Sequence, residues 1–294
     1  MSRGVWNAIG AYLLWGILPI YWKALSHVPA LQILSHRVVW SLVFLALVVA
    51  LRKEWSSLLR EARKPRILGI YIFTGLLIGV NWLTYIWAVN AGHIVETSLG
   101  YFINPLISVL FGSIFLREKL RLTQWIPIAM AGAAVIYLTL GYGTLPWIAL
   151  TLAVTFALYG LLKKITPLGS LHGLTMETGV LLIPCLAYLL CAESNGVGAF
   201  GHAGWVSDSL LLGTGIFTAL PLLMFANAAR SIPLWSIGLL QYIAPTMQFL
   251  IGVLIYGEAF TLARAVGFVI IWSALFFFWL EGFLWRRQDR SNDK

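Results

Sequence analysis

Long apolar segments alternate with short polar connections along the chain. An α-helix needs roughly 20 apolar residues to cross a bilayer, and each segment is close to that length. The connections are too short to hold a soluble domain. The pattern therefore predicts an all-α membrane protein with ten transmembrane helices. The predicted spans are 4–24, 31–51, 67–89, 94–116, 123–141, 145–162, 172–192, 208–229, 234–256 and 262–284.

The composition agrees with this pattern. Hydrophobic residues make up 60% of the 294 residues and charged residues 11%, whereas a soluble domain has roughly 25% charged residues. A soluble domain, a disordered chain and a coiled coil are therefore excluded. The two cysteines, Cys185 and Cys191, lie in one apolar segment, which is not the framework of a disulfide-rich secreted protein.

The basic residues are distributed unevenly between the two sides of the predicted bundle. With the N-terminus in the cytoplasm, seventeen of the 20 lysines and arginines fall on the inner side, Lys163 and Lys164 among them. Lys23 and Arg264 fall outside, and Arg37 alone lies within a span. By the positive-inside rule, both termini are expected in the cytoplasm of a bacterial inner membrane. This asymmetry accounts for the net charge of +9, so no nucleic-acid partner is expected.

The sequence contains an internal repeat. Residues 100–138 align without a gap on residues 240–278, at an offset of 140. A mid-span proline, a glycine and a boundary glutamate recur in register within the two copies. They are Pro105, Gly112 and Glu118 in the first copy and Pro245, Gly252 and Glu258 in the second.

The offset predicts that the second copy is upside down in the membrane. Each copy holds five predicted spans, and an odd number reverses the direction of the next copy. The charges agree, because the loop 117–121 carries three cations and its counterpart 257–261 carries none. We therefore expect a first repeat over 1–141, an inverted second repeat over 142–284 and a basic cytoplasmic tail over 285–294.

The inverted arrangement favours a transporter. Two halves of opposite orientation can exchange conformations around one midplane site, as secondary transporters do. The sequence has no HExxH motif, no P-loop and no nucleophile beside a poised base, so neither an enzyme, a cofactor nor an ATPase subunit is expected. The alternative is a passive channel or facilitator for small polar solutes, although the polar groups within the spans are sparse for a continuous lumen.

Five sequence segments are distinctive. They are HRVVWS at 36–41, NWLTYIWAVN at 81–90, ETSLGYFINPL at 96–106, LYGLLKK at 158–164 and QYIAPT at 241–246. In these segments the chain resembles one known family, the RarD-type permeases of the EamA branch of the drug/metabolite transporter superfamily. The resemblance runs essentially end to end. It departs only in a Gly-rich outer loop over 195–204, in which no motif is expected.

The resemblance implies ten helices in two inverted five-helix repeats around a central cavity. It also implies export of small organic metabolites or amphipathic drug-like compounds, and the RarD label has been tied to chloramphenicol sensitivity. The expected partners are a small-molecule substrate, the lipid bilayer and, as a candidate coupling ion, the proton.

The two spans related by the repeat, 94–116 and 234–256, carry the first group of candidate cavity residues. Helical spacing places polar or small residues on one face of each span. Each proline frees the carbonyl four residues earlier, which then needs a partner in lipid. We expect two bent helices whose polar faces line a hydrated cavity, with close helix packing as the alternative. The residues are Tyr101, Asn104, Ser108, Gln241 and Gln248, with Pro105 and Pro245 as the helix breaks.

Aromatic and amide side chains form the second group. Asn81, Trp82 and Tyr85 lie in the interior of the third span, together with Trp87. Their indole and amide groups need hydrogen-bond partners. A cavity wall made of aromatic rings and amides suits an amphipathic, partly planar ligand. Packing against neighbouring helices is the alternative. Two further aromatic residues, Trp15 and Tyr159, occupy matching positions in the first and sixth spans and are candidates for closing the cavity.

Arg37 is the costliest residue to place in the membrane, since a central arginine is unfavourable by about 2.5–3.5 kcal/mol on insertion scales. Gln32 and His36 make its surroundings polar, and Glu177 stands at the position 140 residues later. Arg37 and Glu177 either pair directly or each serve their own half. Arg37 has two possible roles. It is either a counter-ion for an anionic or dipolar substrate, or a charge that reaches the membrane surface or forms a structural ion pair.

Acidic residues and histidines supply candidate coupling or gating groups. Glu177 is a candidate proton carrier, because a carboxylate at low dielectric can exchange a proton near neutral pH; a structural salt bridge is the alternative. We include His36 in this group. His93 and Glu96 lie three residues apart and fit capping, gating or substrate contact, and no metal is expected there. Glu118 and its repeat counterpart are either solvated boundary charges or symmetric gate contacts.

Overall fold

The computed structural model describes residues 2–91, 93–142, 146–257, 265–267, 269–270, 272–274, 276–277 and 280. Within these residues the regular structure is helical, with no strand. The helices are α1 (Arg3–Ala24), α2 (Ala30–Leu51), α3 (Trp55–Ala62), α4 (Pro65–Asn90), α5 (Ile94–Phe115), α6 (Leu122–Tyr142), α7 (Trp147–Ile165), α8 (Ser170–Ser194), α9 (Trp205–Ser231), α10 (Leu234–Gln241) and α11 (Ile243–Leu254).

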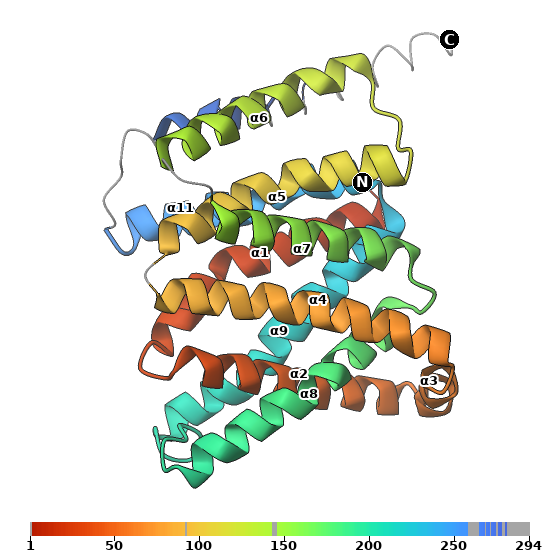
Figure 1. Ribbon diagram of the computed structural model, residues 1–294, viewed down its shortest axis with the longest axis vertical. Helices are drawn as coiled ribbons and strands as arrows, with labels where there is room; N and C mark the ends of the chain where they lie inside the picture. The colour runs from red at the N-terminus through yellow and green to blue at the C-terminus, as the bar shows by residue number, and fades with distance from the viewer. Residues whose placement is uncertain are drawn as a thin grey trace.

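The long helices lie side by side and successive ones run in opposite directions (Figure 1). We call the end at which α1 starts the basic end, because it also carries α3 and the cations of the connection after α2. The other end, which holds the connection between α1 and α2, is the opposite end. This alternation is the arrangement of a bundle that crosses a bilayer several times.

Seven apolar stretches of the described chain are long enough to cross a membrane, with α10 and α11 together forming one of them. Three shorter apolar stretches, Leu99–Phe115, Leu122–Tyr137 and Ala265–Ala274, overlap the other expected spans. These stretches support a multi-pass membrane protein. The count of ten spans stays a prediction.

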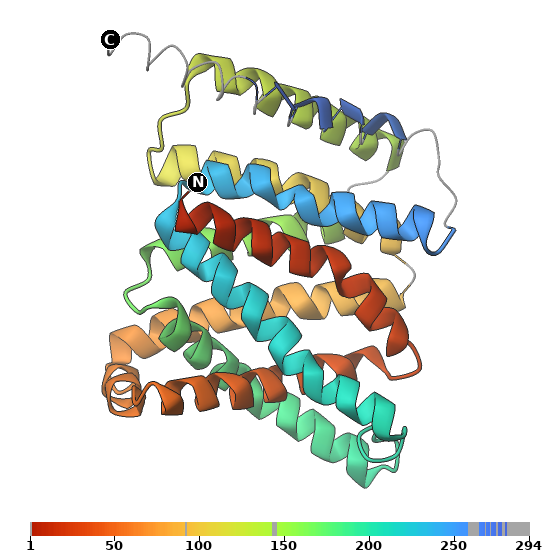
Figure 2. The same cartoon turned by 180° about the vertical axis from the view of Figure 1, so that it is seen from behind.

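The core lies between the two halves of the chain. Helix α1 packs on α9 and α11, α2 on α8 and α9, and α5 on α7 and α10. Figure 2 shows α1 lying beside α11 and α9. The main buried cluster joins Tyr12 and Ile78 of the first half to Tyr159, Leu174 and Phe225 of the second. A site between the halves is therefore built from helices far apart in sequence.

Glycines allow several of these helices to approach closely. A Cβ atom on Gly75 would lie 3.1 Å from the carbonyl oxygen of Glu177, and one on Gly79 would lie 2.7 Å from Leu181. A Cβ atom on Gly215 would clash with the main-chain carbonyl of Trp40. The close approach of α4 to α8 and of α9 to α2 thus depends on the missing side chains.

The two repeat-related spans that contain Pro105 and Pro245 differ in shape. Helix α5 continues through Pro105, whereas the later span divides at Tyr242 into α10 and α11. Pro245 has no N–H group to bond the carbonyl of Gln241, which is the last residue of α10. The helix is therefore interrupted in the later span and continuous in α5; the bending of both helices stays a prediction. The hydroxyl of Tyr242 donates to the carbonyl of Phe102 at 3.2 Å and ties the break to α5.

Candidate functional site

A cavity of about 330 Å³ lies between the halves. This volume is near the lower end of small-molecule sites, about 300–1,000 Å³. Most of its lining residues lie between the middle of their helices and the opposite end of the bundle. They are Tyr12, Trp15, Leu18, Pro19, Trp22, Arg37, Asn81, Trp82, Tyr85, Thr97, Gly100, Tyr101, Asn104, Leu152, Phe156, Leu222, Gln241, Ala244, Pro245 and Gln248.

The structure brings most of the candidate residues together in this cavity. Those that line it are Trp15, Arg37, Asn81, Trp82, Tyr85, Tyr101, Asn104, Gln241, Pro245 and Gln248. Their roles toward a substrate stay predictions. Ser108 is not among the lining residues; its hydroxyl donates to Asn104 Oδ1 at 3.3 Å. Trp87 also lies elsewhere, since it is 47% exposed and packs on Trp147.

One face of α1 forms a wall that the sequence analysis largely missed. Tyr12, Trp15, Pro19 and Trp22 follow each other at spacings of three or four residues. Such spacing puts side chains on one side of a helix. The same pattern in the first span was therefore a usable signal for Tyr12 and Trp22.

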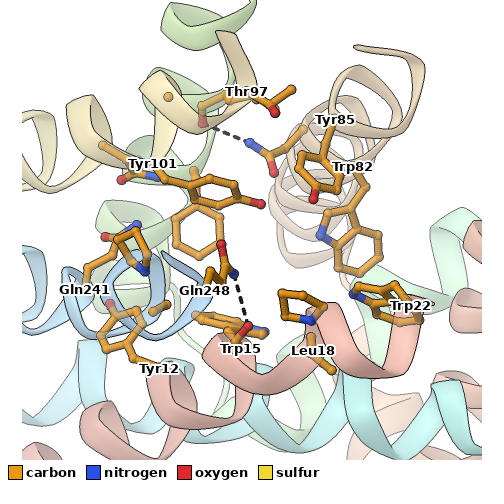
Figure 3. Close-up of a pocket in the computed structure, with 18 of the residues that line it drawn as sticks. Tyr12, Trp15, Leu18, Trp22, Trp82, Tyr85, Thr97, Tyr101, Gln241 and Gln248 are labelled. Atoms are coloured by element: carbon orange, nitrogen blue, oxygen red, sulfur yellow. Dashed lines mark hydrogen bonds between the residues drawn. The ribbon is translucent and has the colours of Figure 1, made fainter. Parts of the chain in front are cut away.

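Aromatic rings enclose much of the cavity, and Figure 3 shows Trp22, Trp82 and Tyr85 on one side of it. The rings of Tyr85 and Tyr101 meet edge to face with centroids 6.0 Å apart. Trp15 meets Phe156 in the same way at 5.7 Å. A planar solute would find ring faces and edges on several sides.

Amide groups gather on other parts of the wall. Gln248 Nε2 donates to the carbonyl of Trp15 at 3.1 Å (Figure 3). Asn81 Nδ2 donates to the carbonyl of Leu152 at 2.9 Å and to Thr155 Oγ1 at 2.8 Å. These bonds fix the orientation of both amides, so the cavity presents polar groups in defined positions.

Arg37 is the one charged lining residue that the described part of the chain provides. Its Nε donates to Thr218 Oγ1 at 3.0 Å. Its guanidinium carbon lies 4.9 Å from the ring centre of Trp22 and 5.0 Å from that of Trp82. No carboxylate among the described residues lies within ion-pair distance of Arg37, so the direct pair with Glu177 is not formed.

Glu177 instead pairs with Lys163, whose Nζ lies 2.7 Å from Glu177 Oε2. The hydroxyl of Tyr159 donates to the same oxygen at 2.9 Å, and Thr74 donates to Oε1 at 2.8 Å. These residues lie outside the cavity lining, toward the basic end. The sequence analysis placed Lys163 among the cations on the inner side of the bundle. In the structure Lys163 is only 2% exposed and has a buried partner, which that prediction missed. Tyr159 belongs to this cluster and not to the cavity wall.

Contacts at the basic end join the two halves of the chain. Glu118 accepts hydrogen bonds from the main-chain N–H groups of Leu234 and Trp235, at 2.8 and 3.1 Å. Its carboxylate also lies 3.3 Å from Lys164 Nζ, which donates to the carbonyl of Ile232. Glu118 therefore occupies the N-terminus of α10, where a negative charge is stabilised. The default expectation of a solvated boundary charge is wrong for Glu118; its counterpart Glu258 lies outside the described residues.

The remaining candidate gating residues lie near the opposite end. His36 is buried, its ring centre is 5.3 Å from that of Phe200, and its Nδ1 has no partner among the described residues. His93 precedes α5 and its ring stacks on Trp87. Glu96 is the third residue of α5, but its side chain lies outside the described residues. None of the three is among the cavity-lining residues.

One side chain of α2 makes two hydrogen bonds to the main chain of the Gly-rich loop over 195–204. Gln32 Nε2 donates to the carbonyl of Val197 at 2.7 Å, and its Oε1 accepts from the N–H of Ala199 at 2.8 Å. In the same loop, His202 Nε2 lies 2.9 Å from Glu193 Oε1. This hydrogen bond and the carboxylate charge raise the pKa of His202 above its ordinary value.

Comparison with known proteins identifies relatives along the whole chain. The model of the EamA-like transporter family matches residues 2–140. "Uncharacterized transporter YojE" of Bacillus subtilis is 43% identical, over 99% of this chain and 98% of its own. "Protein RarD" of Escherichia coli K12 is 39% identical, over 97% of each chain. "Chloramphenicol-sensitive protein RarD" of Pseudomonas aeruginosa is 33% identical, over 98% of each.

A solved crystal structure has the same fold. It superimposes with a TM-score of 0.70 at 19% sequence identity, over 95% of this chain and 98% of its own. At this identity the likeness concerns the fold alone. The named relatives, by contrast, show that the chain is a multi-pass membrane transporter that acts on small molecules. With these identities over nearly its full length, the chain belongs to the RarD-type permeases of the EamA family, within the drug/metabolite transporter superfamily.

Proposed function

We propose that this permease is a secondary active transporter that exports small amphipathic organic molecules across the bacterial inner membrane by alternating access. One observation carries the proposal. A cavity of about 330 Å³ extends from the middle of the bundle toward the opposite end, while Glu118 and Lys164 hold the basic end closed. A site closed on one side is what one extreme of an alternating-access cycle requires.

The orientation follows from the distribution of cations. The positive-inside rule assigns the basic end to the cytoplasm, so both termini are cytoplasmic and the cavity faces outward. The proposed state is the one from which an exported solute would leave. The return to the inward-facing state then requires α10 to separate from Glu118.

The inverted repeat provides the two halves that exchange conformations, over 1–141 and 142–284. In support, α5 runs toward the basic end while α10 and α11 run away from it. Arg117 and Gly257 stand 140 residues apart and both have positive φ, 52° and 63°. Phe102 and Tyr242, also 140 residues apart, are joined by a hydrogen bond.

Protons are the proposed coupling ion, and Glu177 is the proposed carrier. In the closed basic end, Lys163 neutralises its carboxylate and Tyr159 and Thr74 bond to it. Opening this end would admit water to the pair and let Glu177 exchange a proton with the cytoplasm. His36, His93 and Glu96 retain a proposed gating role at the opposite end.

Export is tested by comparing the metabolites in the medium of cells that lack the protein with those of cells that overproduce it. Ala244→Trp fills the cavity, because Ala244 is a lining residue that is only 6% exposed. Val154→Trp is the control, since Val154 faces out of the bundle. We expect some solutes to accumulate in the medium with the wild type and with Val154→Trp, but not with Ala244→Trp. An unchanged profile contradicts export.

Coupling is tested with inverted membrane vesicles and a solute found in that comparison, with chloramphenicol included as a trial compound. We expect uptake to need a pH gradient, to stop when a protonophore is added, and to lose its gradient dependence in Glu177→Gln. Equilibration that ignores the gradient would instead identify a passive facilitator.

A further inference from the structure

The cavity holds a half-buried cation, Arg37, for which the described part of the chain supplies no counter-ion. We propose that the transported solute is an aromatic monoanion whose acidic group binds Arg37. This inference rests on the proposed function, because it takes the cavity to be the transport site. It names a class of substrate that the fold alone does not specify.

The first step concerns the free donors of Arg37. A guanidinium group has five N–H donors, and of these only the Nε donor has a hydrogen-bond partner among the described residues, Thr218 Oγ1. The terminal nitrogens have no hydrogen-bond partner among the described residues. Two parallel N–H groups match the two oxygens of a carboxylate. Arg37 thus presents a fork of the right shape to a carboxylate in the cavity.

The second step concerns the cost of this arrangement without a ligand. A charge taken out of water needs compensation by a partner charge or by hydrogen bonds. Trp22 and Trp82 offer their rings to the guanidinium at 4.9 and 5.0 Å, which supplies only part of that compensation. A bound anion supplies the rest.

The third step concerns the rest of the solute. Beside Arg37, the wall is made of the rings of Trp15, Tyr85, Tyr101 and Phe156. Edge-to-face pairs in this wall leave ring faces and edges for a planar group. A small aromatic system therefore fits both the composition of the wall and the volume of about 330 Å³.

A neutral donor adds to the recognition. Tyr12 lines the cavity, is 0% exposed, and its hydroxyl has no hydrogen-bond partner among the described residues. A buried hydroxyl without a partner is costly. A hydroxyl or carbonyl group on the solute would satisfy it.

The same wall disfavours a positive group on the solute. The described lining residues include no aspartate or glutamate, so an ammonium group would face Arg37 without a counter-ion. We therefore expect a monoanion to bind better than a neutral isostere, and a cation to bind least.

The test uses isosteric probes and the purified full-length protein in lipid nanodiscs, with binding measured by calorimetry. Naphthylacetate and naphthylacetamide differ in charge but hardly in shape, and naphthylethylamine supplies the cation. We expect naphthylacetate to bind tightest. In Arg37→Gln its affinity should fall by at least about tenfold, the usual effect of losing a hydrogen bond to a charged group, while the amide's affinity is unchanged.

Lys23→Gln is the matched control, because it removes a cation near the same end that is outside the cavity lining. It should leave the affinity for naphthylacetate unchanged. Equal binding of acid and amide to the wild type overturns the inference, even if Arg37→Gln fails to fold. An equal loss of both probes in a folded Arg37→Gln also overturns it, since Arg37 would then be structural.

The binding test of Arg37 and the export test of the proposed function can fail independently. If acid and amide bind equally while the cavity-filling variant still abolishes export, the charge preference falls and transport stands. If the acid binds through Arg37 while no solute is exported, the transport proposal falls and the binding preference stands.

Discussion

Lys163 Nζ lies 2.7 Å from Glu177 Oε2, with the two side chains only 3% and 0% exposed. Removing one member of a buried pair leaves an uncompensated charge, which costs about 3–5 kcal/mol. We expect Lys163→Met and Glu177→Gln each to lower the stability of the protein in detergent by about this amount. The double variant should recover much of the loss, because no unpaired charge remains and the amide still accepts from Thr74. Thermal unfolding of the four proteins measures the coupling.

The control for this cycle is Glu61→Gln. Glu61 pairs with Lys64 at 2.7 Å on the surface, where the lysine is 54% exposed. Its loss should change stability by no more than about 0.5 kcal/mol. Strictly additive losses in the double variant Lys163→Met, Glu177→Gln would mean that the two charges do not stabilise each other.

Glu118 should hold the basic end closed. Removing a side chain that accepts from the first N–H groups of a helix costs about 1 kcal/mol, as for an N-cap residue, which is roughly a fivefold change in an equilibrium. We expect Glu118→Ala to speed the labelling of a cysteine placed at the buried Thr166, by a membrane-impermeant maleimide in inverted vesicles. The reporter is built in a chain with Cys185→Ser and Cys191→Ser, so that no other thiol reacts.

The neighbouring variant Lys119→Ala serves as its control, because Lys119 is exposed and also carries a charge. Its labelling rate should equal that of the parent. If Glu118→Ala and Lys119→Ala label at the same rate, Glu118 does not act as a latch.

Gly215→Ala should separate α9 from α2. Its Cβ atom would clash with the carbonyl of Trp40, and Ser41 Oγ donates to the carbonyl of Gly215 at 3.2 Å across the same contact. Overpacking of this kind costs about 1–3 kcal/mol, seen as a lower unfolding temperature. Gly132→Ala is the control, since a Cβ atom there meets nothing within 4 Å. A stability of Gly215→Ala equal to that of the control would contradict this packing.

The inversion of the two halves predicts opposite accessibility of two loops. In the same cysteine-free background, a single cysteine replaces Lys119 or Thr261, one in each loop of the repeat. We expect the first to react only from the cytoplasm and the second only from outside, with an impermeant reagent applied to intact cells or to inverted vesicles. Reaction of both from one compartment would falsify the inverted repeat.

Hydropathy alone placed most helices within a few residues of their observed bounds. The span 208–229 lies within α9, which runs over Trp205–Ser231, because a membrane helix needs nearly uniform apolarity. Helical spacing also predicted that Asn81 and Tyr85 share one face of their helix, and in the structure both line the cavity. The short helix α3, Trp55–Ala62, was not predicted. It mixes apolar and polar residues over only eight positions, so it does not stand out as a long apolar segment.

Hydropathy and helical spacing could not predict the contacts between the two halves of the chain. Lys163 and Lys164 are adjacent, yet one pairs with Glu177 and the other with Glu118. Which way each points depends on the helices packed around α7, and these come from distant parts of the chain. The partners of Glu118 were missed for a related reason, since they are main-chain N–H groups of α10, which no side-chain pattern reveals.

The break at Tyr242 has a mechanical consequence for the cavity. It divides the amide wall, leaving Gln241 on α10 and Gln248 on α11. Glu118 holds the far end of α10, and Gln248 is anchored to Trp15 of α1. A tilt of α10 alone therefore alters the distance between the two amides. The break at Tyr242 thus couples the binding of a solute in the cavity to the contacts that Glu118 makes at the basic end.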